Sequence, residues 1–554
     1  MKRREFLKIS LPTTLGALAL NGFPIKAFAA NRLTQALSCE GIADRILVVV
    51  QLKGGNDGLN NIVPINQFDL YTNLRPTVGI PAGTYLNLDS GMAIENQIGL
   101  HPAMADLKNL YEQGKANIIQ GVGYDNQNRS HFKGTDLWLT GGDSTPENYN
   151  IGTGWMGRYL SATFPGVAGN PNDQMPDPLG IQLGDPKPSL GFHTAEEHAA
   201  AINLSGQDPS GFYSLVSEIG GAAISNLPDS EHGDELAYIM GVEEEVSVYA
   251  QRITQVFNAG SNAVTYPDYD LANQLRTIAR LISGGSKTKI YLVQLGGFDT
   301  HNGQVQDGAQ PAGTHAILLS TLCESVKAFQ DDLAALGHED RVLTVTFSEF
   351  GRKARENGNY GTDHGTLAPM YVFGKGVEAG VTGTNVNLSD LADDYQLQHQ
   401  QHDYRQVFTT ILQDWLGASA ETLEATQFAG FADEKLPFIN NNYLVSPDCY
   451  VSAISTALTP PVAAPVKGDK SLSIYPNPAY GTTFVQVYSD NYQDARLQVS
   501  SLNGGAVISR NVNLEQGPNT LLVDIHHLPA GMYVVQLTTA QGIAYANSKL
   551  TVLR

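Results

Sequence analysis

The chain has 554 residues, of which 42% are hydrophobic and 16% are charged, and its formal net charge at pH 7 is −21. This composition predicts a globular protein rather than a disordered chain, and the excess of carboxylates argues against nucleic acid or an anionic membrane surface as a partner. The three cysteines, Cys39, Cys323 and Cys449, are too few for a disulfide scaffold and lack the Cys-x-x-Cys spacing of a structural zinc site.

Residues 1–29 have the layout of an export signal. Lys2, Arg3 and Arg4 precede an apolar stretch over 9–20, and Ala-Phe-Ala at 27–29 offers a small-residue cleavage site. The paired arginines resemble a twin-arginine signal, which implies export of the folded chain through the inner membrane by the twin-arginine machinery. The apolar stretch is shorter than the roughly 20 residues that span a bilayer, so the sequence predicts no transmembrane helix in the mature chain.

Residues 40–440 form the predicted large domain, in which apolar runs alternate with amphipathic stretches. The runs at 46–50, 118–122, 290–293, 342–345 and 370–373 are typical of buried parallel strands. Helical spacing recurs at 104–111, 235–257, 271–282, 316–336 and 404–416. The alternation predicts an α/β fold with a mainly parallel sheet sandwiched by helices. Cys323 is expected in its core, and the Gly-, Pro- and Asn-rich residues 139–230 are expected to form long loops or an insertion.

Acidic and histidine-containing clusters follow these apolar runs. Ligands of a parallel sheet bind beyond the C-terminal ends of its strands, so we expect the clusters to share one site. Their mixture of carboxylates and imidazoles suits a divalent metal, with zinc as the first choice and magnesium, manganese or calcium as alternatives. The simpler alternative is a set of solvated turns, since Asp57 stands before a glycine. The predicted metal ligands are Asp57, Asp299, His301, Glu349, Asp363 and His364.

Ser130 and His131 lie a few residues after the second apolar run. Ser130 is either a nucleophile that a metal or His131 activates, or the N-cap of a helix over 132–139, and the sequence leaves both open. Arg129 and Arg352 either bind an anionic group or pair with the carboxylates. The predicted catalytic residues are therefore Ser130, His131, Arg129 and Arg352.

Short alternating segments from residue 469 onward predict a small all-β sandwich of about seven strands over 469–554. The segment resembles the type A sorting domain of type IX secretion, through Tyr-Pro-Asn-Pro at 475–478, Leu-Pro-Ala-Gly-Met-Tyr at 528–533 and Lys-Leu-Thr-Val at 549–552. The resemblance implies the type IX export machinery as a partner and a protein that is secreted or anchored at the outer cell surface. The alternative is a generic carbohydrate-binding or adhesion sandwich. A Pro-rich linker is predicted over 441–468.

The motifs of the large domain, taken in order, resemble the bacterial domain-of-unknown-function family 1501. They are Gly-Asn-Asp-Gly-Leu-Asn at 55–60, Arg-Ser-His-Phe at 129–132, Gly-Phe-Asp-Thr-His at 297–301, Ser-Glu-Phe-Gly-Arg at 348–352 and Thr-Asp-His-Gly at 362–365. That family is similar in fold to alkaline phosphatases and sulfatases, which implies a secreted, metal-dependent hydrolase acting on phosphate or sulfate esters. The wider superfamily binds two metals, and the resemblance assigns the corresponding roles to Asp57, Ser130, Asp299, His301 and either Glu349 or Asp363 with His364.

The sequence also departs from the superfamily pattern. Asp299 and His301 are closer together than the usual pair, and Glu349 is followed by Phe-Gly-Arg where Asp-His is expected. A non-catalytic cell-surface protein that binds glycans or anionic polymers with the same fold is therefore the alternative function. Cys39 and Cys449 flank the large domain and can pair in an oxidising compartment, although the interpretation as two unrelated thiols is favoured.

Overall fold

The computed structural model divides into two compact units, residues 1–454 and 455–554. In the large unit it describes residues 42–88, 91–165, 167, 175–194, 201–204, 209 and 249–450, with two short strands, β1 (Ala19–Leu20) and β2 (Phe23–Pro24). In the small unit it describes residues 472–475, 482–501, 505–514, 516–525, 528–529, 531–539 and 547–552. Most of the predicted signal peptide and residues 451–468 of the predicted linker lie outside the described residues.

A nine-stranded sheet runs through the large unit in the order β15-β7-β14-β11-β3-β10-β8-β9, with β18 paired to β7. Paired strands are parallel except at β14, which is antiparallel to β7 and β11. The α/β class with a mainly parallel sheet is thus confirmed, and all five apolar runs lie in strands. The strands are β3 (Ile46–Lys53), β7 (Ala116–Gly123), β8 (Gly180–Gln182), β9 (Ala201–Asn203), β10 (Ile290–Gly296), β11 (Val342–Phe347), β14 (Ala368–Phe373), β15 (Gly380–Thr382) and β18 (His402–Asp403).

The parallel direction expected for the run at 370–373 is wrong. This run forms most of β14, whose residues are all buried. A strand that is buried on both faces is continuously apolar whatever its direction, so the run reports burial and not orientation.

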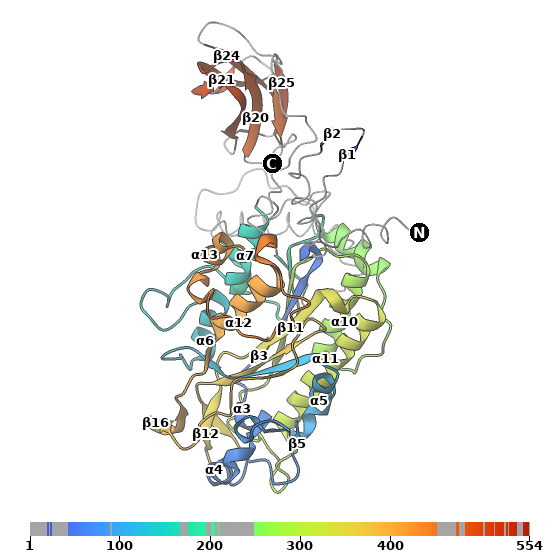
Figure 1. Ribbon diagram of the computed structural model, residues 1–554, viewed down its shortest axis with the longest axis vertical. Coiled ribbons are helices and arrows are strands. Elements are labelled where there is room, and N and C mark those ends of the chain that lie inside the picture. The colour runs from blue at the N-terminus through green and yellow to red at the C-terminus, as the bar shows by residue number, and fades with distance from the viewer. Residues whose placement is uncertain are drawn as a thin grey trace, which may run out of the picture. The chain divides into compact units, whose positions relative to one another are not determined.

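Helices cover both faces of the sheet (Figure 1). Val48 and Val50 of β3 pack in one hydrophobic core, whereas Leu47 and Val49 pack in another, because successive side chains of a strand point to opposite faces. The first core includes side chains of α5 (Ala105–Glu112), α10 (Asp270–Ser283) and α11 (Thr314–Ala335). The second includes side chains of α6 (His131–Thr140), α7 (Trp155–Thr163), α12 (Tyr404–Thr410), the π-helix η8 (Ile411–Trp415) and α13 (Ala420–Thr426).

Of the segment 235–257, which we expect to be helical, the structure describes the part from residue 249, and residues 249–259 are helical. Three of the other predicted helices lie within a turn of α5, α10 and α11, and the segment predicted over 404–416 is divided between α12 and the π-helix η8.

Short elements follow the carboxyl ends of the central strands and hold the candidate site residues. The helix α3 (Gly58–Asn61) follows β3, and the hairpin of β12 (Arg352–Glu356) and β13 (Thr362–His364) follows β11. Further short elements are α4 (Phe68–Leu74), β4 (Ile62–Pro64), β5 (Leu86–Asn87), β6 (Ile98–Leu100), β16 (Leu391–Ala392), β17 (Gln396–Leu397), η1 (Ile42–Asp44), η2 (Ile65–Gln67), η3 (Ile94–Asn96), η4 (Pro102–Met104), η5 (Leu190–Phe192), η6 (Glu339–Arg341), η7 (Asp393–Tyr395), η9 (Ala429–Phe431) and η10 (Pro447–Cys449).

The small unit consists of two antiparallel sheets around one apolar core. One sheet has the order β19-β20-β23 and the other β22-β21-β24-β25, and Val485, Leu497 and Val535 are buried between them. The small antiparallel β-domain expected from the alternating pattern is therefore confirmed. Its strands are β19 (Ser473–Tyr475), β20 (Thr482–Ser489), β21 (Gln493–Ser501), β22 (Ala506–Leu514), β23 (Gly517–Asp524), β24 (Gly531–Thr539) and β25 (Ser548–Val552).

Residues 441–450, assigned from the sequence to the linker, pack on the large unit. Val445 is buried, and its amide donates a hydrogen bond of 3.0 Å to the carbonyl of Asp414. Cys449 is disulfide-bonded, so its interpretation as an unrelated thiol is wrong, whereas Cys39 lies outside the described residues. Cys323 is buried in α11 as expected and is a free cysteine. Within the described residues, no helix is long and apolar enough to cross a membrane.

A candidate metal centre at the strand ends

His131, Asp299 and His364 meet at the carboxyl end of the central sheet. His131 begins α6, Asp299 follows β10, and His364 ends β13. Each side chain offers one ligand atom, and these atoms all lie within 4.8 Å of one another. The structure therefore brings together three of the predicted site residues from distant parts of the sequence.

The orientation of the two imidazoles suits a bound cation. His364 Nδ1 lies 2.9 Å from the carbonyl oxygen of Arg129. A carbonyl only accepts, so Nδ1 carries the proton and a neutral ring turns the lone pair of Nε2 toward Asp299 Oδ1, 3.2 Å away. Burial lowers the pKa of His364, which favours that neutral ring. A lone pair facing a carboxylate is unfavourable unless a positive charge lies between them, which is the requirement a metal ion meets.

Glu349 fixes the orientation of the His131 ring, as the Arg129 carbonyl does for the His364 ring. Its Oε1 lies 2.8 Å from His131 Nδ1 and also accepts a hydrogen bond of 2.8 Å from the Gly54 amide. His131 Nε2 then lies 3.4 Å from Asp299 Oδ2 and is buried without a hydrogen-bond partner among the described residues. The hydrogen bond that His131 donates to Glu349 raises the pKa of His131. Glu349 thus acts as a buried partner that orients a ligand.

His301 and Asp363 extend the cluster on the solvent side. His301 Nε2 lies 3.3 Å from Asp299 Oδ1, and its Nδ1 lies 3.1 Å from Asp363 Oδ1. Asp363 is also 3.4 Å from the ammonium of Lys353. The expectation that every cluster directly follows a strand of the central sheet is wrong for Asp363 and His364, because the β12–β13 hairpin carries them back to the site.

Arg352 is buried beneath Asp299 and pairs with it. Its side chain is 0% exposed, and its Nη2 donates a hydrogen bond of 2.8 Å to Asp299 Oδ1. The guanidinium also donates to the backbone carbonyls of Gly54, Gly55, Phe298 and Thr362. Burial opposes the charge of Asp299, but the hydrogen bond and the positive charge of Arg352 favour the carboxylate, and the pKa of Asp299 is lowered to about 2. Of the two roles considered for Arg352, binding an anionic group or pairing with a carboxylate, the structure shows the pairing.

Asp57 lies apart from this cluster. It is 1% exposed, and its Oδ2 lies 2.6 Å from Arg75 Nη1 and 2.5 Å from Gln304 Nε2. Burial raises its pKa, but the charge and hydrogen bond of Arg75 lower it by more. Sequence reasoning missed Arg75, and no motif in its surroundings marks it. Its Oδ2 is thus held by a guanidinium, whereas its Oδ1 is buried without a hydrogen-bond partner among the described residues.

Ser130 and Arg129 lie beside the centre on exposed backbone. Ser130 occupies the N-cap position of α6, with φ −89° and ψ 129°, yet its side chain makes no capping hydrogen bond. Its amide receives support from Asn128, whose Oδ1 accepts a hydrogen bond of 2.9 Å. The Arg129 side chain is exposed, and only its carbonyl contacts His364. The cap position is as expected, but the bond that would make Ser130 a stabilising cap is missing.

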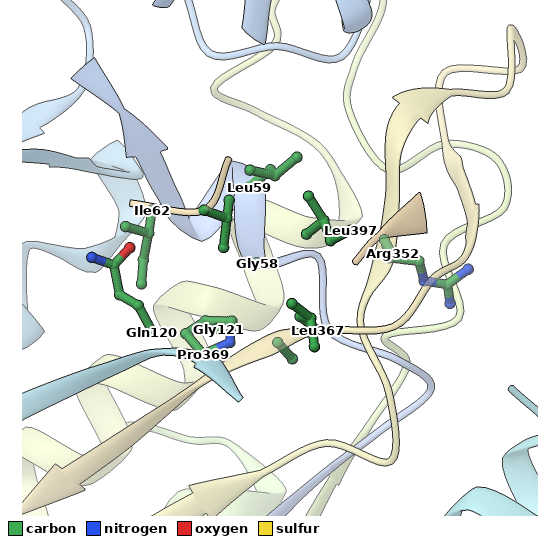
Figure 2. A pocket seen from close by; sticks show the side chains of 11 residues that line it. Gly58, Leu59, Ile62, Gln120, Gly121, Arg352, Leu367, Pro369 and Leu397 are labelled. Atoms are coloured by element: carbon green, nitrogen blue, oxygen red, sulfur yellow. The ribbon is translucent and has the colours of Figure 1, made fainter. Parts of the chain in front are cut away.

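An apolar pocket adjoins the centre and shares Arg352 with it. Figure 2 shows the Arg352 guanidinium pointing away from the other lining side chains, so its charge does not face the pocket. Gln120 is 3% exposed there, and its Nε2 has no hydrogen-bond partner within the described residues. Without a facing cation, the pocket does not suit an anionic group. Its lining consists of Gly58, Leu59, Ile62, Gln120, Gly121, Arg352, Leu367, Ala368, Pro369, Val386 and Leu397.

Fold and site together define an α/β protein with a histidine–carboxylate cluster at the ends of its parallel strands. The family described as "Protein of unknown function (DUF1501)" matches residues 44–425, and the chain belongs to this family. Residues 473–552 match the secretion system C-terminal sorting domain. Both resemblances drawn from the sequence motifs are thereby confirmed at the level of the family and the domain.

Solved structures of several classes are similar to the chain. A protein in the alkaline phosphatase superfamily from Vibrio parahaemolyticus has 10% identity over 87% of this chain and 83% of that chain, with a TM-score of 0.28. The PsFucS1 sulfatase from Pseudoalteromonas sp. has 10% identity over 90% and 87%, with a TM-score of 0.27. A GH3 beta-glucosidase from Bifidobacterium adolescentis has 16% identity over 15% of this chain and 16% of that chain, with a TM-score of 0.12. Scores this low carry no argument about activity. No curated protein matches the chain.

Proposed function

We propose that this protein is a secreted, metal-dependent hydrolase of phosphate or sulfate esters. The observation that carries the proposal is the convergence of His131, His364 and Asp299, whose ligand atoms lie within 4.8 Å of one another. The outer nitrogens of both rings are held by Glu349 and by the Arg129 carbonyl, which leaves the inner nitrogens to a cation. Two imidazoles and a carboxylate suit zinc first, with magnesium, manganese or calcium as alternatives.

In this site, Asp299, His131 and His364 would hold the ion, and His301 and Asp363 would close its outer side. The ion, when bound, supplies a Lewis acid that stabilises negative charge on the transferred group. Arg352 keeps Asp299 ionised and in place. The hydrogen bonds of the Arg352 guanidinium are all made to protein atoms. Arg129, which is exposed beside the centre, offers its guanidinium to the ester oxygens.

Ser130 is our proposed nucleophile. Its side chain is exposed at the start of α6, beside His131, and no capping hydrogen bond holds it in another role. In the proposed step, Ser130 Oγ forms a bond to the phosphorus or sulfur of the ester, its proton goes to water, and the alcohol leaves with a proton from water. A second water then releases the phosphate or sulfate and restores the hydroxyl. His131 faces Glu349 and Asp299, so it orients an ion rather than taking the proton.

The route to the cell surface follows from the two ends of the chain. We propose export through the inner membrane by the twin-arginine machinery, followed by type IX secretion that uses the sorting domain matched at residues 473–552. The mature protein would be secreted or anchored at the outer cell surface, and its acidic charge fits neither nucleic acid nor an anionic bilayer as a partner.

One observation favours the alternative, a non-catalytic surface protein that binds glycans or anionic polymers. The family resemblance counts Asp57 among the residues of a two-metal site, but Arg75 neutralises this carboxylate at 2.6 Å. A site that holds one ion instead of two binds an anion but lacks the second metal that the superfamily uses. The residues to test for anion binding in that case are Arg129 and the ion ligands.

The deciding experiment combines elemental analysis of the purified mature protein with turnover of 4-nitrophenyl phosphate and 4-nitrophenyl sulfate. We expect about one equivalent of a divalent ion in the wild type, hydrolysis of one of the esters, and loss of both ion and hydrolysis in Asp299→Asn. Asp390→Asn is the matched control, because Asp390 pairs with His399 on the exposed surface. An ion without turnover of any ester would favour the binding protein, and no ion after loading would refute the shared site.

A further inference from the structure

Exposed aromatic side chains gather around the candidate metal centre. Among the described residues of the large unit, the exposed aromatic side chains are Phe132 at 87%, Tyr360 at 38% and Tyr395 at 41%. Single exposed apolar residues are common on any protein. Here, however, all three lie beside residues of one site, although they come from separate elements. We call them the aromatic rim.

Phe132 follows His131 in the first turn of α6. Side chains of a helix lean toward its N-terminus, and the N-terminus of α6 is where the metal ligands meet. Tyr360 precedes the strand that carries Asp363, and its carbonyl accepts a hydrogen bond of 2.9 Å from the Gln304 amide. Phe132 and Tyr360 thus lie next to two separate elements that carry residues of the centre.

The residue before Tyr395, Asp394, is linked to the centre through a chain of ion pairs. Asp394 lies 2.7 Å from Lys353 Nζ, and Lys353 lies 3.4 Å from Asp363. Asp363 in turn contacts His301 of the metal centre at 3.1 Å. The segment η7 that carries Tyr395 is therefore tied to the outer side of the site.

The Tyr395 ring is held in place by Arg355, and both tyrosines lie on backbone of an uncommon conformation. Tyr360, Asp394 and Tyr395 have φ values of 52°, 61° and 58°. This left-handed backbone conformation is rare for residues other than glycine. The Arg355 guanidinium lies 4.8 Å from the centre of the Tyr395 ring and donates a hydrogen bond of 2.8 Å to its hydroxyl. An exposed ring that is already immobilised loses little entropy when a ligand stacks on it.

We propose that the aromatic rim binds the sugar rings of an oligosaccharide that carries the ester group, which deepens the proposed function and rests on it. A sugar ring has an apolar face that stacks on an aromatic ring and a polar edge that takes hydrogen bonds. Three rings on α6, the β12–β13 loop and η7 suit a chain of such rings better than one aryl group. Charged groups between them, among them Lys353 and Arg355, offer partners to hydroxyl and anionic substituents.

The test measures binding and turnover separately in the full mature chain. Binding is measured on an array of neutral, sulfated and phosphorylated oligosaccharides of four to six rings, and KM and kcat are compared for an esterified array ligand, 4-nitrophenyl esters and ethyl esters. The variants are Phe132→Ala, Tyr395→Ala and the conservative Phe132→Trp. Ile317→Ala is the control, since Ile317 is 65% exposed on α11.

We expect Phe132→Ala and Tyr395→Ala each to weaken oligosaccharide binding by about fivefold to tenfold, and to raise KM for the esterified oligosaccharide more than for the ethyl ester. Phe132→Trp should restore binding, and Ile317→Ala should match the wild type. Oligosaccharide binding that depends on the aromatic rim, without turnover of any ester, would refute the hydrolase proposal and support oligosaccharide binding by the rim. Equal oligosaccharide binding in all variants would overturn the rim, and a KM change confined to 4-nitrophenyl esters would assign it to an aryl group instead.

Discussion

Glu349 Oε1 lies 2.8 Å from His131 Nδ1, and this contact turns the opposite nitrogen of the ring toward Asp299. The side chain of Glu349 is 2% exposed, whereas that of Asp299 is 48% exposed. A buried carboxylate therefore orients a histidine whose inner nitrogen faces a solvent-accessible carboxylate. This is the arrangement in which an outer partner raises the basicity of a metal ligand.

Glu349→Gln should weaken metal binding without unfolding the protein. The amide keeps the shape of the side chain but removes the charge that raises the pKa of His131, so the ring becomes a poorer ligand. We expect affinity for zinc to fall by about tenfold to a hundredfold, as measured by competition with a chelator. Glu378→Gln, at a carboxylate that accepts a hydrogen bond from Asn440 on the exposed surface, is the control. An unchanged affinity for zinc would show that Glu349 does not support the metal site.

The fold was largely predictable because burial leaves a direct mark on sequence. Each strand of the core needs a run of apolar residues, and the run at 46–50 reappears as β3. The site was predictable in outline for a related reason, because Asp299 and Glu349 directly follow such runs and the ends of parallel strands meet at one edge. His364 was found through its motif alone, since the hairpin that returns it to the site has no apolar run.

The partners of these residues were not predictable. Arg352 follows Glu349 closely, but nothing local shows that its guanidinium turns inward to four carbonyls and Asp299. Arg75 reaches Asp57 from beyond α4, a contact set by tertiary packing. The absence of a capping bond at Ser130 is likewise a matter of side-chain rotamer, which a favourable residue type does not determine.

Arg75→Met should destabilise the protein strongly. The side chains of Arg75 and Asp57 are both 0% exposed, and Arg75 also donates to Asn60 and to the carbonyls of Lys353 and Ala354. Removal of one partner leaves a buried charge without compensation, which costs about 3–5 kcal/mol in the free energy of unfolding. Urea denaturation measures this cost. Lys375→Met, in an ion pair on the surface, should change stability little. A similar small change in Arg75→Met would show that Asp57 finds other partners.

Asp143 should make stability depend on acid pH. Burial opposes its ionisation, but hydrogen bonds from Thr145 and Arg405 outweigh it and lower its pKa to about 2. Unfolded aspartate titrates near pH ~3.9, so the unfolded chain binds the proton more tightly, and the stabilisation is present above that pH and lost as the pH falls toward 2. Asp143→Asn should therefore be less stable than the wild type by about 2 kcal/mol at pH 7. The difference should shrink between pH ~4 and ~2 in denaturant titrations, and a constant difference would contradict the pairing.

Ser130→Ala separates chemistry from capping. A serine that caps a helix contributes about 1 kcal/mol to stability, but the Ser130 side chain makes no capping hydrogen bond, so we expect the free energy of unfolding to change by less than about 0.5 kcal/mol. Metal content should stay at the wild-type level, because His131, Asp299 and His364 are untouched. Turnover of an ester should be lost if Ser130 Oγ forms the covalent intermediate, since no other step replaces that bond. Ser389→Ala, at an exposed loop serine that donates to Asn387, is the matched control. Retained turnover with an unchanged melting temperature would assign the nucleophile to water and leave Ser130 without a role in the reaction.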